Sequence, residues 1–292
     1  MKWSVLLIPF LLGACSQHIG KPTMPPPAPV ESSYRISRDL VFTPGAATQK
    51  LLADLYTPNL TPPGAGFPAV VLIHGGAWVR GDREQVQSLA ERIAGRGYVV
   101  MNITYRLAPE HLFPAQVLDV QQAVKWLRAN AQSQRVDAKR IAGWGYSAGA
   151  HLAAMLANLS PGDALYDEQA RVQVLVAGGS PVDLRKFQNG YLVPRFLGTT
   201  YQKNPQRFAE ASPAVFISAD DPPVFLYHGT WDNLVPLDQA TDYKTELDAA
   251  GITTELFLIK GHGHISAFFA DGDAVKAGLE FLDRNLKPKS GK

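Results

Sequence analysis

One serine of this chain has the surroundings of a nucleophile. The sequence GYSAG at residues 145–149 matches the pattern G-x-S-x-G. Residues 140–144 before it favour a short strand, and the small residues 148–159 after it favour a helix. Glycines at both flanking positions permit a sharp turn from which the hydroxyl of Ser147 projects, at a helix amino end that favours negative charge. The pattern therefore predicts nucleophilic catalysis by Ser147.

A serine hydroxyl becomes a strong nucleophile only when a base removes its proton. The sequence GHGH at residues 261–264 follows a predicted strand at 254–259 and offers two histidines in a loop. Both His262 and His264 remain candidates, and we favour His264 because it lies at the end of the loop. The other five histidines fit loop, leader or packing roles: His18, His74, His111, His151 and His228.

A catalytic histidine needs an acid that fixes its tautomer. Asp232 follows a predicted strand at 224–227 and is our candidate, with the role of a turn former as the alternative. Asp238, a few residues later, better fits a helix-entry position. The predicted triad therefore runs Ser147, Asp232, His264 along the chain.

Hydrolysis of an acyl group also needs donors for a tetrahedral oxyanion. The sequence HGGAW at residues 74–78 follows a predicted strand at 69–73, and its glycines allow the backbone to approach a substrate. We expect the amides of Gly76, Ala77 and Ala148 to form this oxyanion hole. A plain glycine turn is the alternative.

The elements that would position these residues alternate along the chain. Apolar runs predict strands at 51–56, 69–73, 98–103, 140–144, 172–177, 224–227 and 254–259. Helical spacing of apolar residues predicts helices at 84–94, 117–127, 148–159, 237–250 and 274–286. This alternation favours an α/β fold with one mostly parallel sheet of about eight strands and helices on both faces. The candidate residues all follow strands, where function gathers in such sheets.

Composition excludes several classes of protein. The chain has 292 residues, of which 46% are hydrophobic and 18% are charged, so it can form a large core. The formal net charge is +2 with no basic stripe, which argues against a nucleic-acid partner. The single cysteine, Cys15, excludes intramolecular disulfides and multi-cysteine zinc sites. We expect no metal and no organic cofactor.

The first residues have the pattern of a targeting signal. A basic start and an apolar run over residues 3–12 lead to small residues before Cys15. This ending resembles a bacterial lipoprotein signal, in which residues 1–14 are removed and Cys15 carries acyl chains. An ordinary secretory peptide is the alternative. The resemblance implies a lipid-anchored protein of the bacterial cell envelope that faces the periplasm, and Ser16 favours the outer membrane.

The sequence after Cys15 predicts the domain organisation. Five prolines within residues 21–33 favour an extended tether over residues 15–33, with a leader of no spacing role as the alternative. The hydrolase domain is expected at residues 34–286, and residues 287–292 should form a solvated tail. No feature predicts an oligomeric state.

Taken together, these motifs resemble a known group of enzymes. HGGAW, TYRLAPEHLFP at residues 104–114, GYSAG, HGTWDNLVP at residues 228–236 and GHGH are similar to α/β-hydrolase esterases. The nearest groups are the hormone-sensitive-lipase-like, feruloyl/acetylxylan esterase and kynurenine formamidase groups. Ala77 stands where many members have a third glycine, which leaves the main-chain donors intact.

The resemblance implies a serine carboxylesterase that acts through an acyl-enzyme. No long insertion suggests a large lid, so we expect small, soluble acyl esters as substrates. Trp78, Phe187, Tyr191 and Phe196 are candidates for the acyl pocket, with a role in the core as the alternative. An amidase, formamidase or peptidase on the same scaffold is the second reading. A non-catalytic envelope lipoprotein is the third.

Overall fold

The computed structural model describes residues 16–22, 25–43 and 49–287. The predicted signal peptide at residues 1–14, the predicted lipidation site Cys15 and residues 288–292 of the predicted tail lie outside the described residues. Among the described residues, no helix combines the length and the apolar character that a membrane crossing needs.

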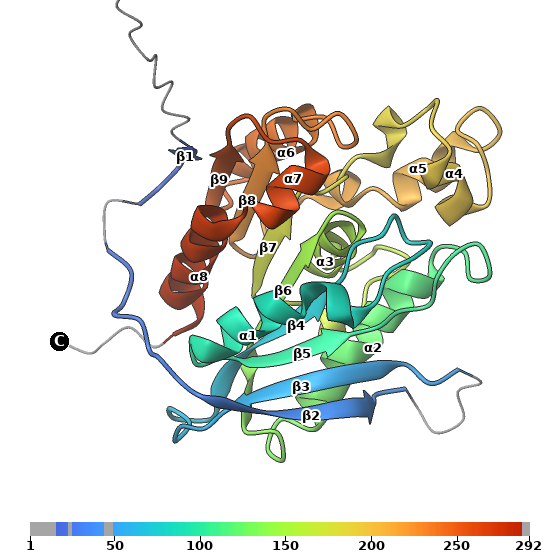
Figure 1. Ribbon diagram of the computed structural model, residues 1–292. Coiled ribbons are helices and arrows are strands. Elements are labelled where there is room, and N and C mark those ends of the chain that lie inside the picture. The colour runs from blue at the N-terminus through green and yellow to red at the C-terminus, as the bar shows by residue number, and fades with distance from the viewer. Residues whose placement is uncertain (1–15, 23–24, 44–48, 288–292) are drawn as a thin grey trace, which may run out of the picture.

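A single sheet runs through the described chain (Figure 1). Its nine described strands follow the order β1-β9-β8-β7-β6-β4-β5-β3-β2. Their bounds are β1 Gln17–Ile19, β2 Tyr34–Val41, β3 Leu52–Pro58, β4 Phe67–Ile73, β5 Val99–Ile103, β6 Val136–Tyr146, β7 Val174–Gly178, β8 Val224–Gly229 and β9 Thr254–Ile259.

The centre of the sheet is parallel and its edges are antiparallel. Strands β4 to β9 pair in parallel, whereas β1 pairs antiparallel with β9 and β3 pairs antiparallel with both β2 and β5. The parallel strands are buried along nearly their whole length, as their continuous apolar runs predict. The predicted α/β-hydrolase fold class is confirmed.

Helices cover both faces of the sheet. The principal helices are α1 Gln87–Gly95, α2 Ala115–Ala129, α3 Ala148–Asn158, α6 Asp238–Ala249 and α8 Gly272–Leu286. Val70 and Leu72 of β4 pack in the same apolar cluster as α1 and α8, whereas Val71 and Ile73 pack with α2, α3 and α6. This alternation follows from the two-residue period of a strand.

The segment between β7 and β8 contributes only short helices near the carboxyl ends of the strands (Figure 1). It contains α4 Leu192–Leu197 and α5 Pro205–Glu210. A further short helix, α7 His264–Phe269, follows β9. The 3₁₀ turns are Arg83–Val86, Glu168–Ala170, Leu184–Lys186 and Pro213–Phe216. The short helices α4, α5 and α7 lie near the strand ends at which the candidate residues lie.

The structure corrects two boundaries of the predicted organisation. Residues 17–19, expected in a free tether, form β1 and pair with β9. Lys287, expected in a solvated tail, instead packs against the domain, where its Nζ lies 2.7 Å from a carboxylate oxygen of Asp283 and donates to the Arg96 carbonyl at 3.0 Å. β2 begins at Tyr34, where the globular part was expected to start.

Candidate active site

Ser147 occupies the turn between β6 and α3 in a conformation that few residues adopt. Its φ is 56° and its ψ is −125°, and its amide donates to the Gly178 carbonyl at 2.7 Å. A Cβ at Gly145 would lie 2.3 Å from the Gly149 carbonyl carbon, and one at Gly149 would lie 2.1 Å from the Ile73 oxygen. The flanking glycines are therefore required by close backbone approach, and the strained turn presents the hydroxyl.

The structure brings the three predicted triad residues into one hydrogen-bonded series. The Oγ of Ser147 lies 2.8 Å from Nε2 of His264. The Nδ1 of His264 lies 2.6 Å from Oδ2 of Asp232. The carboxylate accepts the Nδ1 proton, so Nε2 is left free to accept the serine proton. This arrangement can activate a hydroxyl.

Asp232 is buried and held as a carboxylate. Its Oδ1 accepts hydrogen bonds from the amides of Leu234 at 3.0 Å and Val235 at 2.8 Å. Burial alone would raise the pKa of this carboxyl, but the hydrogen bond and charge of His264, the Val235 amide and His228 together hold the pKa below its ordinary value. The negative charge beside His264 is therefore maintained near neutral pH.

His264 is the first residue of α7, and its backbone is fixed by a neighbour of the serine. The hydroxyl of Tyr146 donates to the His264 carbonyl at 2.6 Å. Of the two histidines in the loop, it is His264 whose ring contacts Ser147, whereas His262 uses its carbonyl to accept the Trp231 amide at 2.9 Å. The choice of His264 agrees with this geometry.

The predicted oxyanion loop approaches the serine closely. Gly76, Ala77 and Trp78 have φ values of 112°, 54° and 61°, so three successive residues lie in the left-handed region. A Cβ at Gly75 would be 3.5 Å from the Ser147 Cβ. Within the described chain, the amides of Gly76 and Ala77 donate no hydrogen bond to another residue. Donors in this state are available to a substrate oxygen.

Trp78 ties this strained loop to the helices. Its indole Nε1 donates to Nδ1 of His151 at 3.1 Å, and Nε2 of His151 donates to the Ala211 carbonyl at 2.7 Å. The indole also stacks on Phe196, with ring centroids 4.4 Å apart and planes at 10°. Burial lowers the pKa of His151 to about 4, so the ring is neutral and its two nitrogens hold these opposite roles.

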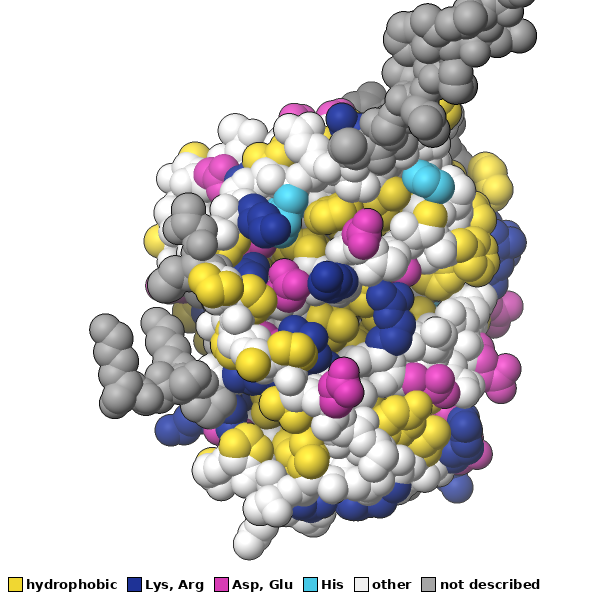
Figure 2. Space-filling model, turned by 60° about the vertical axis from the view of Figure 1, so that its left-hand side comes forward, with side chains coloured by type: hydrophobic (Ala, Val, Ile, Leu, Met, Phe, Trp, Pro, Cys, Tyr) yellow, Lys and Arg dark blue, Asp and Glu magenta, His cyan; other side chains and the backbone are white. Residues whose placement is uncertain are grey.

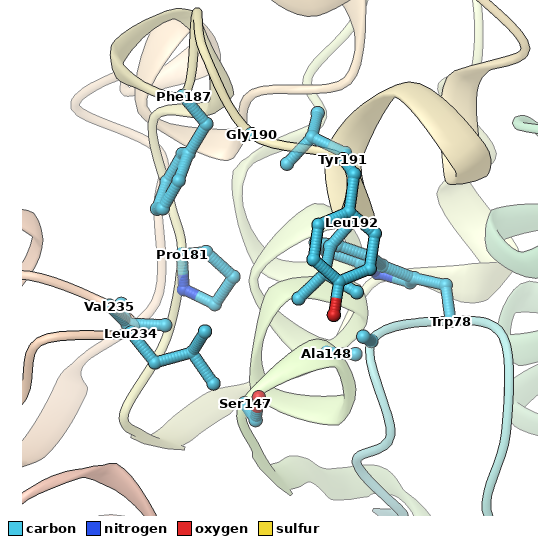
Figure 3. Close-up of a pocket in the computed structure, with 12 residues that line it drawn as sticks. Trp78, Ser147, Ala148, Pro181, Phe187, Gly190, Tyr191, Leu192, Leu234 and Val235 are labelled. Carbon is cyan, nitrogen blue, oxygen red and sulfur yellow. The ribbon is translucent and has the colours of Figure 1, made fainter.

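An apolar cavity of about 180 Å³ opens beside Ser147. Figure 3 shows Pro181 and Leu234 on one side of the serine and Tyr191 and Trp78 on the other, with the Tyr191 hydroxyl directed inward. The full lining is Ala77, Trp78, Ser147, Ala148, Pro181, Phe187, Gly190, Tyr191, Leu192, Val193, Leu234 and Val235. This volume lies below the usual range of ligand pockets, about 300 to 1,000 Å³.

The candidates for the acyl pocket separate into two groups. Trp78, Phe187 and Tyr191 line the cavity. The expectation for Phe196 is wrong, because this residue is fully buried behind Trp78 and does not line the cavity. Its place on the inward face of α4, against Trp78 and Phe113, explains the difference.

Several residues that support the site are not identified as site residues by the sequence. The sequence favours a packing role for His151, but its ring also accepts a hydrogen bond from Trp78. Tyr146 occupies a position that the pattern G-x-S-x-G leaves open, yet its hydroxyl donates to the His264 carbonyl. His228 lies four residues before Asp232, and its Nε2 is 3.4 Å from the Asp232 carboxylate. The signal that could have identified these residues is the presence of a histidine or tyrosine in or near a catalytic motif.

Comparison with known proteins places the chain in a family. The model of the BD-FAE family matches residues 53–247, which include Ser147, Asp232 and the loop at Gly76. The chain belongs to the BD-FAE family. The match extends from β3 to α6, so it ends before His264. The BD-FAE assignment agrees with the α/β-hydrolase fold of the sheet.

Two proteins to which the chain is similar are named as ester hydrolases. Esterase LipQ of Mycobacterium tuberculosis is 30% identical over 249 residues, covering 82% of this chain and 59% of that protein. Ethyl acetate hydrolase of Pseudomonas putida is 29% identical over 225 residues, covering 72% of this chain and 69% of that protein. The chain spans 44% to 59% of the lengths of LipQ, LipC and LipM of M. tuberculosis.

Solved structures show the same architecture. Thermogutta terrifontis esterase 2, phosphoramylated by tabun, superposes with a TM-score of 0.72 at 27% identity, covering 88% of this chain and 97% of that chain. The butyrate-bound structure of that esterase gives a TM-score of 0.72 at 25% identity, covering 89% and 97%. The similarity thus extends over nearly the whole described domain.

Proposed function

We propose that this chain is a serine carboxylesterase that hydrolyses small, soluble acyl esters. The observation that carries the proposal is the series from Ser147 through His264 to Asp232, with separations of 2.8 Å and 2.6 Å. Membership of a family with named esterase relatives supports the same activity.

Acylation follows from the positions of the two nitrogens of His264. Nε2 takes the Ser147 proton while Oγ attacks the ester carbonyl carbon, and the amides of Gly76, Ala77 and Ala148 stabilise the oxyanion. The imidazolium, stabilised by Asp232, then gives its proton to the leaving alcohol oxygen as the carbon–oxygen bond breaks. The product of this half-reaction is an acyl group on Ser147 and a free alcohol.

Deacylation repeats the sequence with water as the nucleophile. His264 accepts a proton from the water, whose oxygen attacks the acyl carbon, and then returns that proton to Oγ of Ser147. The carboxylic acid leaves, and the site regains its starting protonation. Each step uses only the chain's own residues and water.

Labelling by a fluorophosphonate probe tests the nucleophile. The full chain should form a covalent adduct at Ser147, and the Ser147→Ala variant should form none while retaining its thermal unfolding midpoint. A wild-type chain that is folded but unlabelled, and that hydrolyses no ester, would instead favour a non-catalytic lipoprotein.

The size of the cavity supports a preference for short acyl groups. An apolar space of about 180 Å³ beside Ser147 suits acetyl to butyryl chains. We expect kcat/KM on p-nitrophenyl esters to be highest in this range and to fall for octanoyl and longer chains. Faster hydrolysis of long-chain esters or triglycerides would contradict the proposal.

Amide substrates define the second candidate activity. An amide needs protonation of a poorer leaving group at the same site, so we expect an ester to be hydrolysed faster than an anilide with the same acyl group. Rates measured in parallel on such a matched pair, including a formanilide, decide between the two. A faster anilide reaction would assign the chain to the amidase or formamidase reading.

We also propose that the chain is lipid-anchored at Cys15 in the bacterial cell envelope and faces the periplasm, with the outer membrane favoured by Ser16. The signal-like residues 1–14 support this placement. Incorporation of labelled palmitate, lost in Cys15→Ser, and fractionation of the envelope would test it. A mature chain without acyl groups would contradict it.

A further inference from the structure

Large apolar side chains are exposed where the chain leaves β8 and β9. Phe269, Trp231, Ile265 and Leu234 are exposed by 79%, 71%, 63% and 48%. Trp231 and Leu234 follow β8, whereas Ile265 and Phe269 lie on α7 after β9. We call these four residues the apolar rim. Such large side chains on an outer surface usually mark an interaction site when they gather together.

The rim belongs to one surface beside the cavity. The Trp231 amide donates to the His262 carbonyl at 2.9 Å, so the loop after β8 contacts the loop that leads into α7. Leu234 itself lines the cavity. Phe269 packs on Phe268, with ring centroids 5.2 Å apart. The rim therefore reaches the cavity through Leu234, and its other residues lie on the loop after β8 and on α7.

The N-terminal strand begins at the same end of the molecule. Because β1 runs antiparallel to β9, Gln17 pairs with Leu258 near the carboxyl end of β9, and Ile19 pairs with Leu256. Figure 1 shows β1 beside β9 at the end that carries α7. The described chain starts at Ser16, so the preceding residues join it at this end.

The position of β1 is fixed by side chains. The Nε2 of His18 lies 2.8 Å from Oε2 of Glu255, and Oε1 of the same carboxylate accepts from Nη2 of Arg284 at 2.8 Å. The His18 ring packs against Phe257, with ring centroids 5.6 Å apart. Only Ser16 separates β1 from Cys15, and each extended residue spans at most about 3.6 Å. An acyl group on Cys15 would therefore start close to Gln17, at the end of the sheet that carries α7.

A lipid bilayer is the occupant that these features favour. Exposed tryptophan and phenylalanine beside aliphatic side chains suit the boundary between headgroups and acyl chains. Acyl chains on Cys15 would hold the domain at the bilayer surface, where an exposed apolar contact adds to the attachment. The neighbouring side face mixes acidic and basic side chains with apolar ones (Figure 2), which suits water better than lipid.

We propose that the apolar rim inserts into the interfacial layer of the membrane that carries the Cys15 anchor. The cavity opening then borders the bilayer, and the domain does not hang freely on a proline-rich tether. The inference rests on the proposed lipid attachment at Cys15 and is independent of the ester chemistry.

The single cysteine makes the test direct. Acylation of Cys15 leaves no free thiol, so Phe269→Cys introduces one thiol for an environment-sensitive NBD label on the full, lipidated chain. Ser133→Cys is the matched control, because Ser133 is exposed in the loop before β6, at the opposite end of the sheet. Both proteins are reconstituted into vesicles of phosphatidylethanolamine and phosphatidylglycerol.

On vesicles, the label at position 269 should shift its emission to shorter wavelength and be quenched by nitroxide lipids, whereas the label at 133 should show neither change. Brominated lipids should also quench tryptophan emission of the unlabelled protein, and Trp231→Phe should remove most of that quenching, since Trp78 and Trp144 are buried and Trp126 is partly buried on α2. Equal behaviour of the two labels would overturn the inference.

Two further results would also overturn it. A shift at position 269 without vesicles that grows with protein concentration would assign the rim to a second copy of the chain. A mature chain without acyl groups on Cys15 would remove the anchor. Hydrolysis of a short soluble ester, measured on the same samples, reports separately on the proposed esterase.

Discussion

Ser147 combines two properties that a reactive hydroxyl needs. Its left-handed φ of 56° projects Oγ from the turn, and the ring of His264 lies at 2.8 Å. The same turn places the amide of Ala148 at the start of α3, where helix donors lack partners. Activation of the nucleophile and stabilisation of the oxyanion therefore depend on one backbone conformation.

The two loop histidines give a direct prediction about the base. We expect His264→Ala to lower kcat on the order of 10⁴-fold, because the serine loses its proton acceptor. His262→Ala should change kcat by less than about tenfold, since His262 contributes a backbone carbonyl that the variant keeps. Steady-state kinetics on one short ester measures both. The reverse order would assign the base to His262.

His151 gives a prediction about pH and stability. Its pKa of about 4 lies below the ordinary 6.5, so the fold is stabilised by the neutral ring. This stabilisation is fully present above about pH 6.5. As the pH falls toward 4, the unfolded chain binds a proton that the buried ring excludes, so the free energy of unfolding falls by about 3 kcal/mol. Denaturant unfolding of the wild type and His151→Gln at about pH 7 and about pH 4.5 measures it.

The wild type should lose more unfolding free energy between the two pH values than His151→Gln, because glutamine does not titrate. An equal loss in both proteins would show that protonation of His151 does not weaken the fold.

For single residues, the sequence predicts the candidate catalytic side chains better than the side chains that hold them in place. Ser147, Asp232 and His264 could be named because catalysis requires certain side chains directly after strands. The contact of Trp78 with His151 could not be named, because it joins a loop to a helix that lies far along the chain. Phe187 and Phe196 look alike in sequence, but only the first faces the cavity.

Among the strands and helices, the longer ones could be predicted from the sequence and the shortest could not. β4 and β5 are continuous apolar runs in the buried centre, so their sequences identify them. β1 has only three residues, of which two are polar, and is recognisable only when β9 is beside it. α7 has six residues and no complete amphipathic period.

β1 should depend on one side-chain contact. We expect His18→Ala to weaken the docking of β1 by about 1 kcal/mol, which makes the amides of β1 exchange roughly fivefold faster. The reason is the loss of the 2.8 Å hydrogen bond to Glu255. Hydrogen exchange measured by mass spectrometry follows peptides from residues 16–22 and from β9.

His111→Ala provides the control, since His111 lies in the loop before α2, away from β1. Unchanged exchange in His18→Ala would show that the backbone pairing alone holds β1.

Across the whole molecule, Asp283 joins the C-terminal helix to the turn between α1 and β5. This fully buried carboxylate on α8 accepts from Nε of Arg96 at 2.8 Å and from the Tyr98 hydroxyl at 2.8 Å, and it pairs with Lys287 at 2.7 Å. It thereby connects the C-terminal helix to the end of α1 and the start of β5.

Replacement of this carboxylate should destabilise the entire fold. We expect Asp283→Asn to lower the unfolding free energy by about 3 to 5 kcal/mol, because two cationic side chains lose their buried partner. Asp273→Asn, at an exposed position of the same helix, should change it by less than about 1 kcal/mol. Thermal unfolding of both variants checks the prediction. Similar midpoints would show that the network is dispensable.

The overall architecture was accessible from the sequence because it repeats one rule. Alternating strands and helices of sufficient length specify a parallel sheet covered on both faces. The antiparallel edges and the packed Lys287 were not accessible, because each depends on a partner from a distant part of the chain.

The double role of Trp78 limits how the proposed esterase could be redesigned. Its indole forms part of the cavity wall and also secures the loop that holds Gly76 and Ala77. Replacing Trp78 with a smaller residue to admit bulkier substrates would also loosen the loop on which the rate of hydrolysis is expected to depend. Protein engineers who seek a broader acyl range should begin at Phe187 or Leu192, whose removal enlarges the space and leaves that turn intact.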